Sequence, residues 1–236
     1  MNLILLFPDD FTAPDRVFLG GRRFEHIRDI LKAPCGKSLA VGKVNGLMGQ
    51  GTIVAQKADG FELEVQFDLK PPEALPLTLI LGLPRPPMLK RLLFSAAMLG
   101  VKKIIILNFN RVEKSLWNSS SLGPQAIEEQ LVLGLEQAKD TLMPEVSLKK
   151  RFKPFVQDEL PALIKGSTAL VAHPGGAPLS APIGKPVALI IGPEGGILDY
   201  EIELLKAAGC RPLDLGPRIL RTESVFPFIV GKLFAF

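Results

Sequence analysis

Hydrophobic and polar positions follow two different rhythms along the chain. In the first part, apolar residues alternate with polar ones over short runs bounded by turn residues, a pattern typical of half-buried strands. The runs with this pattern are 3–7, 16–19, 38–44, 52–56 and 61–67. Asn45-Gly46 lies between two of them and favours a hairpin turn. The pattern predicts a small β-barrel or sheet.

One stretch of this first part, 22–31, has the period of a helix. Phe24, Ile27, Ile30 and Leu31 share one face, and a Pro-Cys-Gly sequence follows as a stop. The opposite face is polar and mostly basic. It carries Arg22, Arg23, His26 and Lys32.

Prolines separate this part from the rest of the chain. Residues 70–76 read KPPEALP, and successive prolines lack the N–H groups that a strand ladder uses. The sequence therefore predicts a domain of residues 1–69, a stiff linker of residues 70–76 and a second domain of residues 77–236.

The second domain shows apolar strand-like runs that alternate with helical stretches. The runs are 77–83, 104–108, 146–148, 169–172, 187–191 and 210–215, and the helical stretches are 88–99, 125–139, 156–164 and 199–208. Such alternation predicts an α/β fold with a mostly parallel sheet covered on both faces. Sheets of this kind bind ligands beyond the carboxyl ends of their strands.

Composition narrows the class of protein further. With 47% hydrophobic and 22% charged residues the chain is globular, and no apolar run reaches the roughly 18 residues of a membrane span. The opening MNLILLFPDDF has no basic segment, so we expect no signal peptide and a cytoplasmic protein. Cys35 and Cys210 are far apart with no His or Cys partner nearby, so we expect no metal site.

The positive charge is unevenly spread. The net charge is +4, and six of the basic residues fall within 22 positions. They are Arg22, Arg23, Arg28, Lys32, Lys37 and Lys43. A local basic face indicates an anionic partner, although a solvated helix face gives the same pattern.

Three segments, expected to be loops at the carboxyl ends of the last three strands, hold the candidate chemistry: HPGG (173–176), GPEGG (192–196) and LGPRILRTE (215–223). Glycine lets a backbone approach a ligand closely and offers its amides as donors. Known phosphate loops do not fit, because Leu31 stands where a P-loop ending in GKS would need glycine, and no GxGxxG follows a strand. This disfavours an ATPase or a dinucleotide-binding oxidoreductase.

IIGPEGG, LDYEIELLKAAG and LGPRILRTES together resemble the C-terminal signature of the SPOUT superfamily of α/β-knot methyltransferases. The resemblance is to the family that methylates N3 of a uridine in 16S ribosomal RNA. HIRDILKAPCG is similar to that family's PUA-like RNA-binding barrel, and Glu136-Gln137 to a central signature. The resemblance implies S-adenosylmethionine as methyl donor, a trefoil knot, and a homodimer with its sites at the subunit interface.

The resemblance also implies a cofactor pocket built from the three segments. Its residues would be Val171, Ala172, His173, Ile191, Gly192, Pro193, Glu194, Gly195, Gly196, Leu215, Gly216, Ile219 and Leu220. For Ile191, Leu215 and Leu220 the alternative is a place in the apolar core. For His173 it is the end of a strand.

Arg218, Arg221, Thr222 and Glu223 are the candidate catalytic residues, and the last three would face the base. Uridine N3 becomes a nucleophile when its proton leaves, and the charge then spreads onto the neighbouring carbonyl oxygens. Arg221 or Arg218 could stabilise that charge, and Glu223 could take the proton or hold Arg221. A structural Arg221–Glu223 ion pair is the alternative.

Ribosomal RNA is the expected partner, bound by the basic residues of the first domain. The candidates are Arg22, Arg23, His26, Arg28, Lys32 and Lys43. A loop between Phe109 and Trp117, with Arg111 and Lys114, could stack a splayed base, and a core tryptophan is the competing interpretation.

Several positions depart from the family pattern. At the positions of Ser95 and Met98 the family usually has lysine and glutamate, and at the positions of Asp140 and Lys32 it usually has arginine. Asp140 reverses a charge, so the RNA target could differ. Two other functions therefore stay open: methylation of another RNA position by the same fold, and a non-catalytic RNA-binding or ribosome-assembly factor.

Overall fold

The computed structural model describes residues 1–178 and 184–234, and within them the chain forms two compact units. The first consists of Met1–Glu73 and Leu131–Met143, and the second of Ala74–Gln130 and Pro144–Phe236. The change from one unit to the other at Glu73 falls inside the expected linker. Residues 131–143 were expected in the second domain, so their place in the first unit is a difference that the sequence pattern did not reveal.

The first unit is built on a six-stranded sheet with the order β1-β4-β5-β6-β3-β2. Its pairings are antiparallel except for β1 with β4, which is parallel. The strands are β1 (Ile4–Leu6), β2 (Phe11–Ala13), β3 (Arg16–Gly20), β4 (Ser38–Lys43), β5 (Met48–Gln56) and β6 (Gly60–Leu69). β5 starts earlier than expected, because Gly49 and Gly51 interrupt the apolar alternation that marks a strand.

The expected helix of this unit forms in two parts. The two parts are α1 (Gly21–Glu25) and a wider π-helical segment η2 (His26–Leu31), which follow β3. A separate short helix, η1 (Pro8–Asp10), precedes β2. Phe24 and Ile27 point into the core, where they pack with side chains of the sheet such as Phe61 and Leu63. Ile30 is 69% exposed, so the apolar face is shorter than its sequence pattern suggests.

Residues 131–143 join the first unit through backbone contacts. The carbonyl of Glu136 accepts hydrogen bonds from the amides of Asn2 and Leu3, each at 3.0 Å. Thr141 donates to the carbonyl of Gly46 at 2.6 Å, and its own carbonyl accepts from the Asn45 amide at 2.7 Å. The expected Asn45-Gly46 turn is therefore held by a distant segment of the chain.

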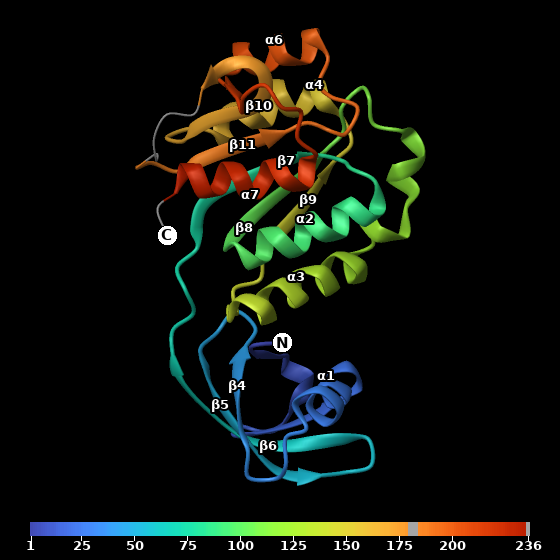
Figure 1. The fold of residues 1–236 in the computed structure, drawn as a ribbon, viewed down its shortest axis with the longest axis vertical. Helices are drawn as coiled ribbons and strands as arrows, with labels where there is room; N and C mark the ends of the chain where they lie inside the picture. Colours follow the sequence, from blue (N-terminus) through green and yellow to red (C-terminus); the bar gives the residue numbers. More distant parts are fainter. Residues whose placement is uncertain (179–183, 235–236) are drawn as a thin grey trace. The chain divides into compact units, whose positions relative to one another are not determined.

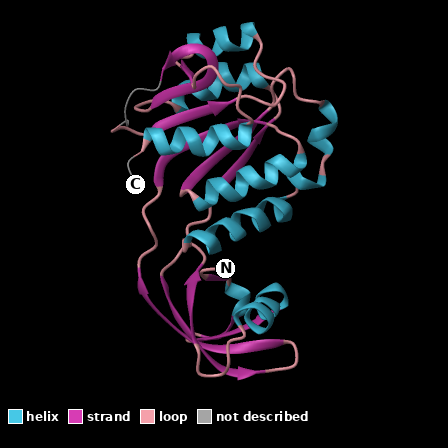
Figure 2. Cartoon of the chain, in the orientation of Figure 1, coloured by secondary structure: helices cyan, strands magenta, loops and turns pink. Residues whose placement is uncertain are grey.

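The second unit holds a parallel six-stranded sheet with the order β12-β10-β11-β7-β8-β9. This confirms the α/β class and the parallel arrangement. Strands β7 to β11 are labelled in Figure 1, and strands are drawn in magenta in Figure 2. The strands are β7 (Leu75–Gly82), β8 (Val101–Leu107), β9 (Glu145–Lys149), β10 (Thr168–Pro178), β11 (Val187–Ile191) and β12 (Arg211–Asp214). All five residues of β11 are buried, as expected for a strand covered on both faces.

Helices surround this sheet. α2 (Pro86–Met98) and α7 (Thr222–Leu233) contact each other and lie across one face, and α6 (Asp199–Ala207) packs against β12 (Figure 1). α3 (Pro124–Ala138) connects the two units along the chain. The expected helix 156–164 forms as α4 (Phe152–Pro154), the π-helical η5 (Phe155–Glu159) and α5 (Leu160–Leu163). Short helices η3 (Lys114–Asn118) and η4 (Ser120–Leu122) follow β8.

The sequence pattern did not predict α7. Pro227 lies inside it, and proline in a helix interior removes a hydrogen bond and clashes with the preceding turn. Val225, Phe226, Ile229, Val230 and Leu233 are nevertheless all buried. Burial of a large apolar side chain contributes roughly 1.5–3 kcal/mol, so the buried face outweighs one proline.

Candidate functional site

Three segments converge at one edge of the parallel sheet, because the carboxyl ends of β10, β11 and β12 point the same way. The end of β7 also reaches this edge. A Cβ on Gly82 would lie 2.5 Å from the Pro193 nitrogen, so only glycine fits beneath the segment 192–196. The structure therefore brings the three predicted cofactor-binding segments to neighbouring strand ends.

The HPGG segment differs from the simple loop expected. It lies within β10, where the register with β12 shifts so that Ala172 and Ala177 both pair with Leu213. Residues 173–176 thus bulge out of the ladder. A Cβ on Gly176 would lie 2.4 Å from the Pro212 carbonyl carbon, so the base of this bulge is pressed against β12. His173 lies inside the bulge, so it does not end the strand.

Asp214, the last residue of β12, binds two of the three segments. Its Oδ2 accepts a hydrogen bond from the Gly175 amide at 3.0 Å, and its Oδ1 accepts one from the Gly216 amide at 2.7 Å. These backbone donors, Gly216 first and Gly175 next, lower the pKa of Asp214. Sequence reasoning missed this residue, although an acidic side chain two positions before a glycine is a known turn signal.

The GPEGG segment is a tight turn held from outside. The Gly196 amide donates to the Pro193 carbonyl at 2.8 Å, with Gly196 at φ +79°. Arg111 Nη1 donates to the Gly195 carbonyl at 2.8 Å. Arg85 lies 3.5 Å from Glu194 and 3.6 Å from Glu113, with its side chain 68% exposed, so these pairs contribute little.

The loop that carries Arg111 is itself anchored. Glu201 is fully buried near the start of α6, and its carboxylate accepts the amides of Asn110 at 2.8 Å and Leu198 at 2.9 Å. Trp117 is half-buried and donates to the Asn108 side chain at 2.8 Å, with Lys150 over its ring. These contacts favour a packing role for Trp117 over base stacking.

The candidate catalytic residues lie where the third segment becomes α7. Arg221 is the exposed N-cap residue, while Thr222 and Glu223 form the first turn, with Thr222 8% exposed. The expectation of a continuous loop through residue 223 was therefore wrong, since the helix begins at Thr222. Arg218 lies in the exposed part of the segment.

Glu223 has an unusual environment. Its Oε1 lies 3.7 Å from Arg91 Nη1 of α2, and its Oε2 is buried with no hydrogen-bond partner among the described residues. In the described part of the chain no Arg221–Glu223 ion pair forms. Arg91 was missed because its partner is 132 positions away in the sequence.

The apolar residues of the predicted pocket separate into two groups. Ile191, in β11, is 3% exposed, so its side chain lies in the apolar core, which was the alternative to a place in the pocket. Leu215 and Leu220 are half-buried, and Ile219 is 98% exposed. The stretch from Gly216 to Ile219 thus leaves its backbone and one large apolar side chain open to a ligand or partner.

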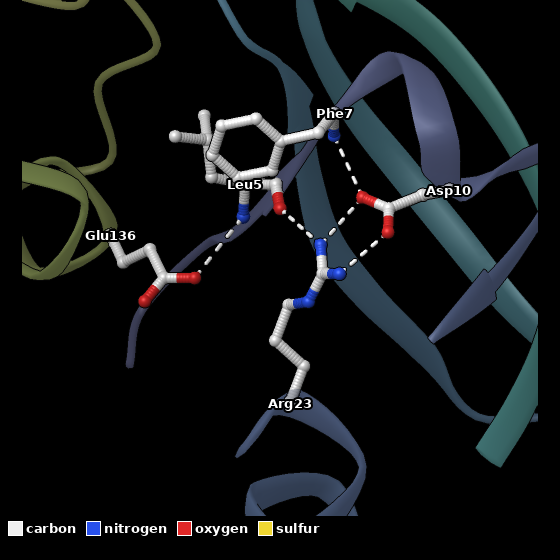
Figure 3. A network of polar contacts seen from close by, with 5 residues as sticks. All are labelled: Leu5, Phe7, Asp10, Arg23 and Glu136. Carbon is white, nitrogen blue, oxygen red and sulfur yellow. Dashed lines mark hydrogen bonds and ion pairs between the residues drawn. The ribbon is translucent and has the colours of Figure 1, made fainter. Parts of the chain in front are cut away.

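Most of the candidate RNA-binding residues make contacts within the first unit. Figure 3 shows the Arg23 guanidinium between the carboxylate of Asp10, at 2.5 and 2.6 Å, and the carbonyl of Leu5, at 2.9 Å. Arg22 binds the buried carboxylate of Glu136 at 2.7 Å, and the same carboxylate accepts the Leu5 amide. Asp10 and Glu136 were not recognised as their partners from the sequence.

Three other basic candidates have no buried acidic partner among the described residues. Arg28 pairs with its neighbour Asp29 on the surface, and Lys43 lies over the rings of Phe11 and Phe67, 5.1 and 4.4 Å from their centroids. Lys32 is exposed at φ +47° and has no charged partner within the described ranges.

His26 has a buried Nε2 that lacks a hydrogen-bond partner among the described residues. Burial, followed by the charges of the N-terminal amine and Arg22, lowers the pKa of His26. The shift favours the neutral form of the ring, which disfavours a direct role in binding phosphate.

One of the positions that depart from the family pattern, Asp140, has a structural role in this chain. Asp140 is 2% exposed and its Oδ1 accepts the Leu142 amide at 2.9 Å, so this carboxylate serves the fold of residues 131–143. Ser95 is half-buried on α2, and Met98 is 37% exposed near the end of the same helix.

Neither a metal centre nor a membrane span is found in the part of the chain that the structure describes. Residues 1–178 and 184–234 contain no group of three or more His, Cys, Asp or Glu side chains able to hold a metal ion. None of their helices has the length and apolar character needed to cross a bilayer. Cys35 is exposed, and burial raises the pKa of Cys210 to about 11.

Comparison with known proteins finds a matching family over most of the chain. The family described as the RNA methyltransferase domain matches residues 71–233. Ribosomal RNA small subunit methyltransferase E of Treponema pallidum is 28% identical over 234 residues, which cover 95% of this chain and 87% of that protein. Methyltransferase E 1 of Borreliella burgdorferi is 25% identical over 228 residues, covering 95% and 93% of the two chains.

Solved structures share the fold over nearly the whole chain. A methyltransferase from Legionella pneumophila with bound SAM aligns with a TM-score of 0.75 at 23% identity, covering 98% of this chain and 96% of that one. Ribosomal RNA small subunit methyltransferase E from Neisseria gonorrhoeae, bound to S-adenosyl methionine, aligns with a TM-score of 0.76 at 19% identity, covering 98% and 95%.

Proposed function

Because the chain belongs to the RNA methyltransferase family, we propose that it transfers a methyl group from S-adenosylmethionine to N3 of a uridine in 16S ribosomal RNA. Two relatives that match over 95% of this chain are named as methyltransferases of small-subunit ribosomal RNA. Two structures of the same fold were solved with the same cofactor bound. The observation that carries the proposal is the convergence of three glycine-containing segments at one edge of the parallel sheet.

The residues at this edge fit S-adenosylmethionine. Gly175, Gly196 and Gly216 all have positive φ, a conformation that turns the backbone sharply without a side chain in the way. Exposed backbone groups of 192–196 and 215–220 can hydrogen-bond the adenine and ribose, while half-buried Leu215 and Leu220 supply apolar contacts. When bound, the cofactor supplies an electrophilic methyl group on a sulfonium, so the protein needs no metal.

Glu223 is the best-supported proton acceptor. Its Oε2 is buried and lacks a donor among the described residues, and an unpaired buried carboxylate oxygen is costly unless a ligand satisfies it. An N3–H of uridine is such a donor. Glu223 would take that proton, while Arg91 holds the other carboxylate oxygen.

The exposed arginines have a separate role in the proposal. As the proton leaves N3, negative charge develops on the adjacent carbonyl oxygens of the uracil ring. Arg221 and Arg218 are both exposed beside α7, and a guanidinium offers several directional donors to such oxygens. Thr222, in the same turn, would face the base.

RNA would be held by the first unit, which we propose to be a PUA-like domain. Lys32, Lys43 and Arg28 are the candidates left without a buried acidic partner. Arg22 remains 46% exposed in its pair with Glu136 and can also meet a phosphate. Arg23 is 19% exposed and bound to Asp10, so we assign it mainly to the fold.

Three further features belong to the same proposal: a trefoil knot in the second unit, a homodimer and a cytoplasmic location. The knot and the dimer rest on the family resemblance of residues 192–196 and 215–224. The location rests on the proposed ribosomal substrate.

The test combines calorimetric titration with S-adenosylmethionine and mass mapping of methyl groups in ribosomal RNA from cells that lack the protein. We expect binding and the loss of one N3-methyluridine, restored when purified protein is added to that RNA or to small subunits. Binding with loss of a methyl group elsewhere would replace uridine N3 by another position. Absence of binding would favour a non-catalytic RNA-binding factor.

A further inference from the structure

Two of the three segments proposed to hold the cofactor share one side chain. Residues 173–176 bulge from β10 and residues 215–220 follow β12, and they are about 40 positions apart in sequence. The carboxylate of Asp214 accepts one amide from each, Gly175 through Oδ2 and Gly216 through Oδ1. No other side chain in the described residues hydrogen-bonds the backbone of both segments.

Both amides belong to glycines whose conformation other residues rarely adopt. Gly175 has φ +78° and Gly216 has φ +100°, and no atom within 4 Å would obstruct a Cβ at either position. Glycine is thus needed here for backbone geometry and not for space. Free glycines sample many conformations, so a turn of this kind needs an external contact to hold it.

Packing against β12 fixes the base of the bulge but not its tip. Gly176 is pressed against Pro212 and Leu213, where a side chain could not fit. Gly175, one residue earlier, is exposed, and within residues 1–178 and 184–234 Asp214 is the side chain that hydrogen-bonds it. The carboxylate therefore determines where the exposed tip lies relative to the segment that begins at Leu215.

We propose that Asp214 is a positioning residue of the cofactor pocket, whose carboxylate holds segments 173–176 and 215–220 at the spacing that S-adenosylmethionine requires. This rests on the proposed function of that site. A single carboxylate can serve both segments because its two oxygens accept independently. An amide in its place offers one acceptor and one donor, so it can hold only one of the two glycines.

The depressed pKa of Asp214 agrees with this role, because the same two amides stabilise the charged carboxylate. The stabilisation that these hydrogen bonds give is fully present above the ordinary pKa of an aspartate, about 3.9. It is lost as the pH falls through the lower pKa that Asp214 has in the folded protein. Asp214 is therefore charged, and accepts both hydrogen bonds, at neutral pH.

The experiment compares Asp214→Asn with the wild type and with Asp158→Asn, an exposed aspartate of the same unit that has no contact with the pocket. Calorimetry should show S-adenosylmethionine affinity reduced at least about tenfold in D214N and unchanged in D158N, since a charged hydrogen bond is lost. Amide exchange, followed by NMR, should show Gly175 or Gly216 less protected in D214N. Wild-type affinity in D214N would overturn the proposal.

Failure of the proposed function gives a different result. If the wild type itself does not bind S-adenosylmethionine, the pocket assignment is wrong. Unchanged protection of both amides in D214N would then also overturn the positioning role of Asp214. If D214N does not fold, the wild type alone decides. Its Gly175 and Gly216 amide resonances should titrate with one shared midpoint below about 3.9, and separate midpoints would contradict the proposal.

Discussion

At the scale of single residues, the structure separates side chains that chemistry needs from those that the fold needs. Sequence reasoning grouped Arg22, Arg23 and Arg28 as interchangeable RNA contacts because all three are basic and close together. In the structure Arg22 pairs with a buried glutamate, Arg23 with a nearly buried aspartate, and Arg28 with an exposed aspartate next to it in the sequence. Equal charge therefore does not imply equal roles, because burial of the partner sets the cost of removing it.

Glu223→Gln should lower the rate of methyl transfer by about 100-fold or more while leaving cofactor affinity unchanged, because glutamine cannot accept the N3 proton. Single-turnover assays with ribosomal RNA measure the first quantity and calorimetry the second. Glu203→Gln, on the exposed surface of α6, is the matched control. A wild-type rate in E223Q would remove Glu223 as the proton acceptor.

Arg23→Ala should destabilise the protein by about 3 kcal/mol, since it leaves the Asp10 carboxylate without its partner in a site 10% exposed. Arg28→Ala should change the free energy of unfolding by less than about 0.5 kcal/mol, because its pair with Asp29 is on the surface. Urea unfolding measures both variants. Equal losses would show that the buried contact in Figure 3 has no special weight.

At the scale of elements, local periodicity is a good guide where helices and strands are regular and a poor one where they are not. The six strands of the parallel sheet were all expected, with ends that differ by a few residues except in β10, which continues through the HPGG segment to Pro178. α7 was missed, since Pro227 and the preceding glycine-proline turn are strong signals against a helix. Burial of its apolar face against α2 and β11 overrides those signals.

The contact between the ends of β7 and β11 gives a prediction at this scale. Gly82→Ala places a Cβ 2.5 Å from the Pro193 nitrogen, so segment 192–196 must move and S-adenosylmethionine affinity should fall by about tenfold or more. Gly231→Ala in α7 meets no atom within 4 Å and should instead stabilise the helix by about 1 kcal/mol. Calorimetry and thermal melting test both, and undiminished affinity in G82A would contradict the tight contact.

At the scale of the whole molecule, the order of the chain and the composition of its units do not coincide. Residues 131–143 belong to the first unit, where the Glu136 carbonyl binds the amides of Asn2 and Leu3 and its carboxylate binds Arg22. The family signature Glu136-Gln137 thus contains a structural anchor of the N-terminal sheet.

A fragment of residues 1–73 should therefore fail to fold as a stable domain, although the sequence pattern marks residues 1–69 as one. It lacks the acceptors that Asn2, Leu3 and Arg22 use, and each lost hydrogen bond removes about 0.5–1.5 kcal/mol of net stability. Circular dichroism and NMR dispersion measure the outcome. A fragment as well ordered as in the full chain would show that residues 131–143 add little.

The proposed homodimer is also a property of the whole molecule. Sedimentation at micromolar concentration should give about twice the chain mass of 25.6 kDa. Charge-reversed variants on exposed parts of the first unit, such as Lys32→Glu, should leave this mass unchanged. A strict monomer would contradict an interface site.

By itself the sequence determined the class of fold, the parallel direction of the strands in the second sheet and the three segments in which to look for a pocket. These follow from local periodicity and from the conformations open to glycine and proline, which act over a few residues. The tertiary structure alone decided the partners of Glu223, Asp214 and Arg111, the helix α7 and the placement of residues 131–143. Each of these depends on contacts between distant positions or on burial, and neither quantity is encoded in the spacing of neighbouring residues.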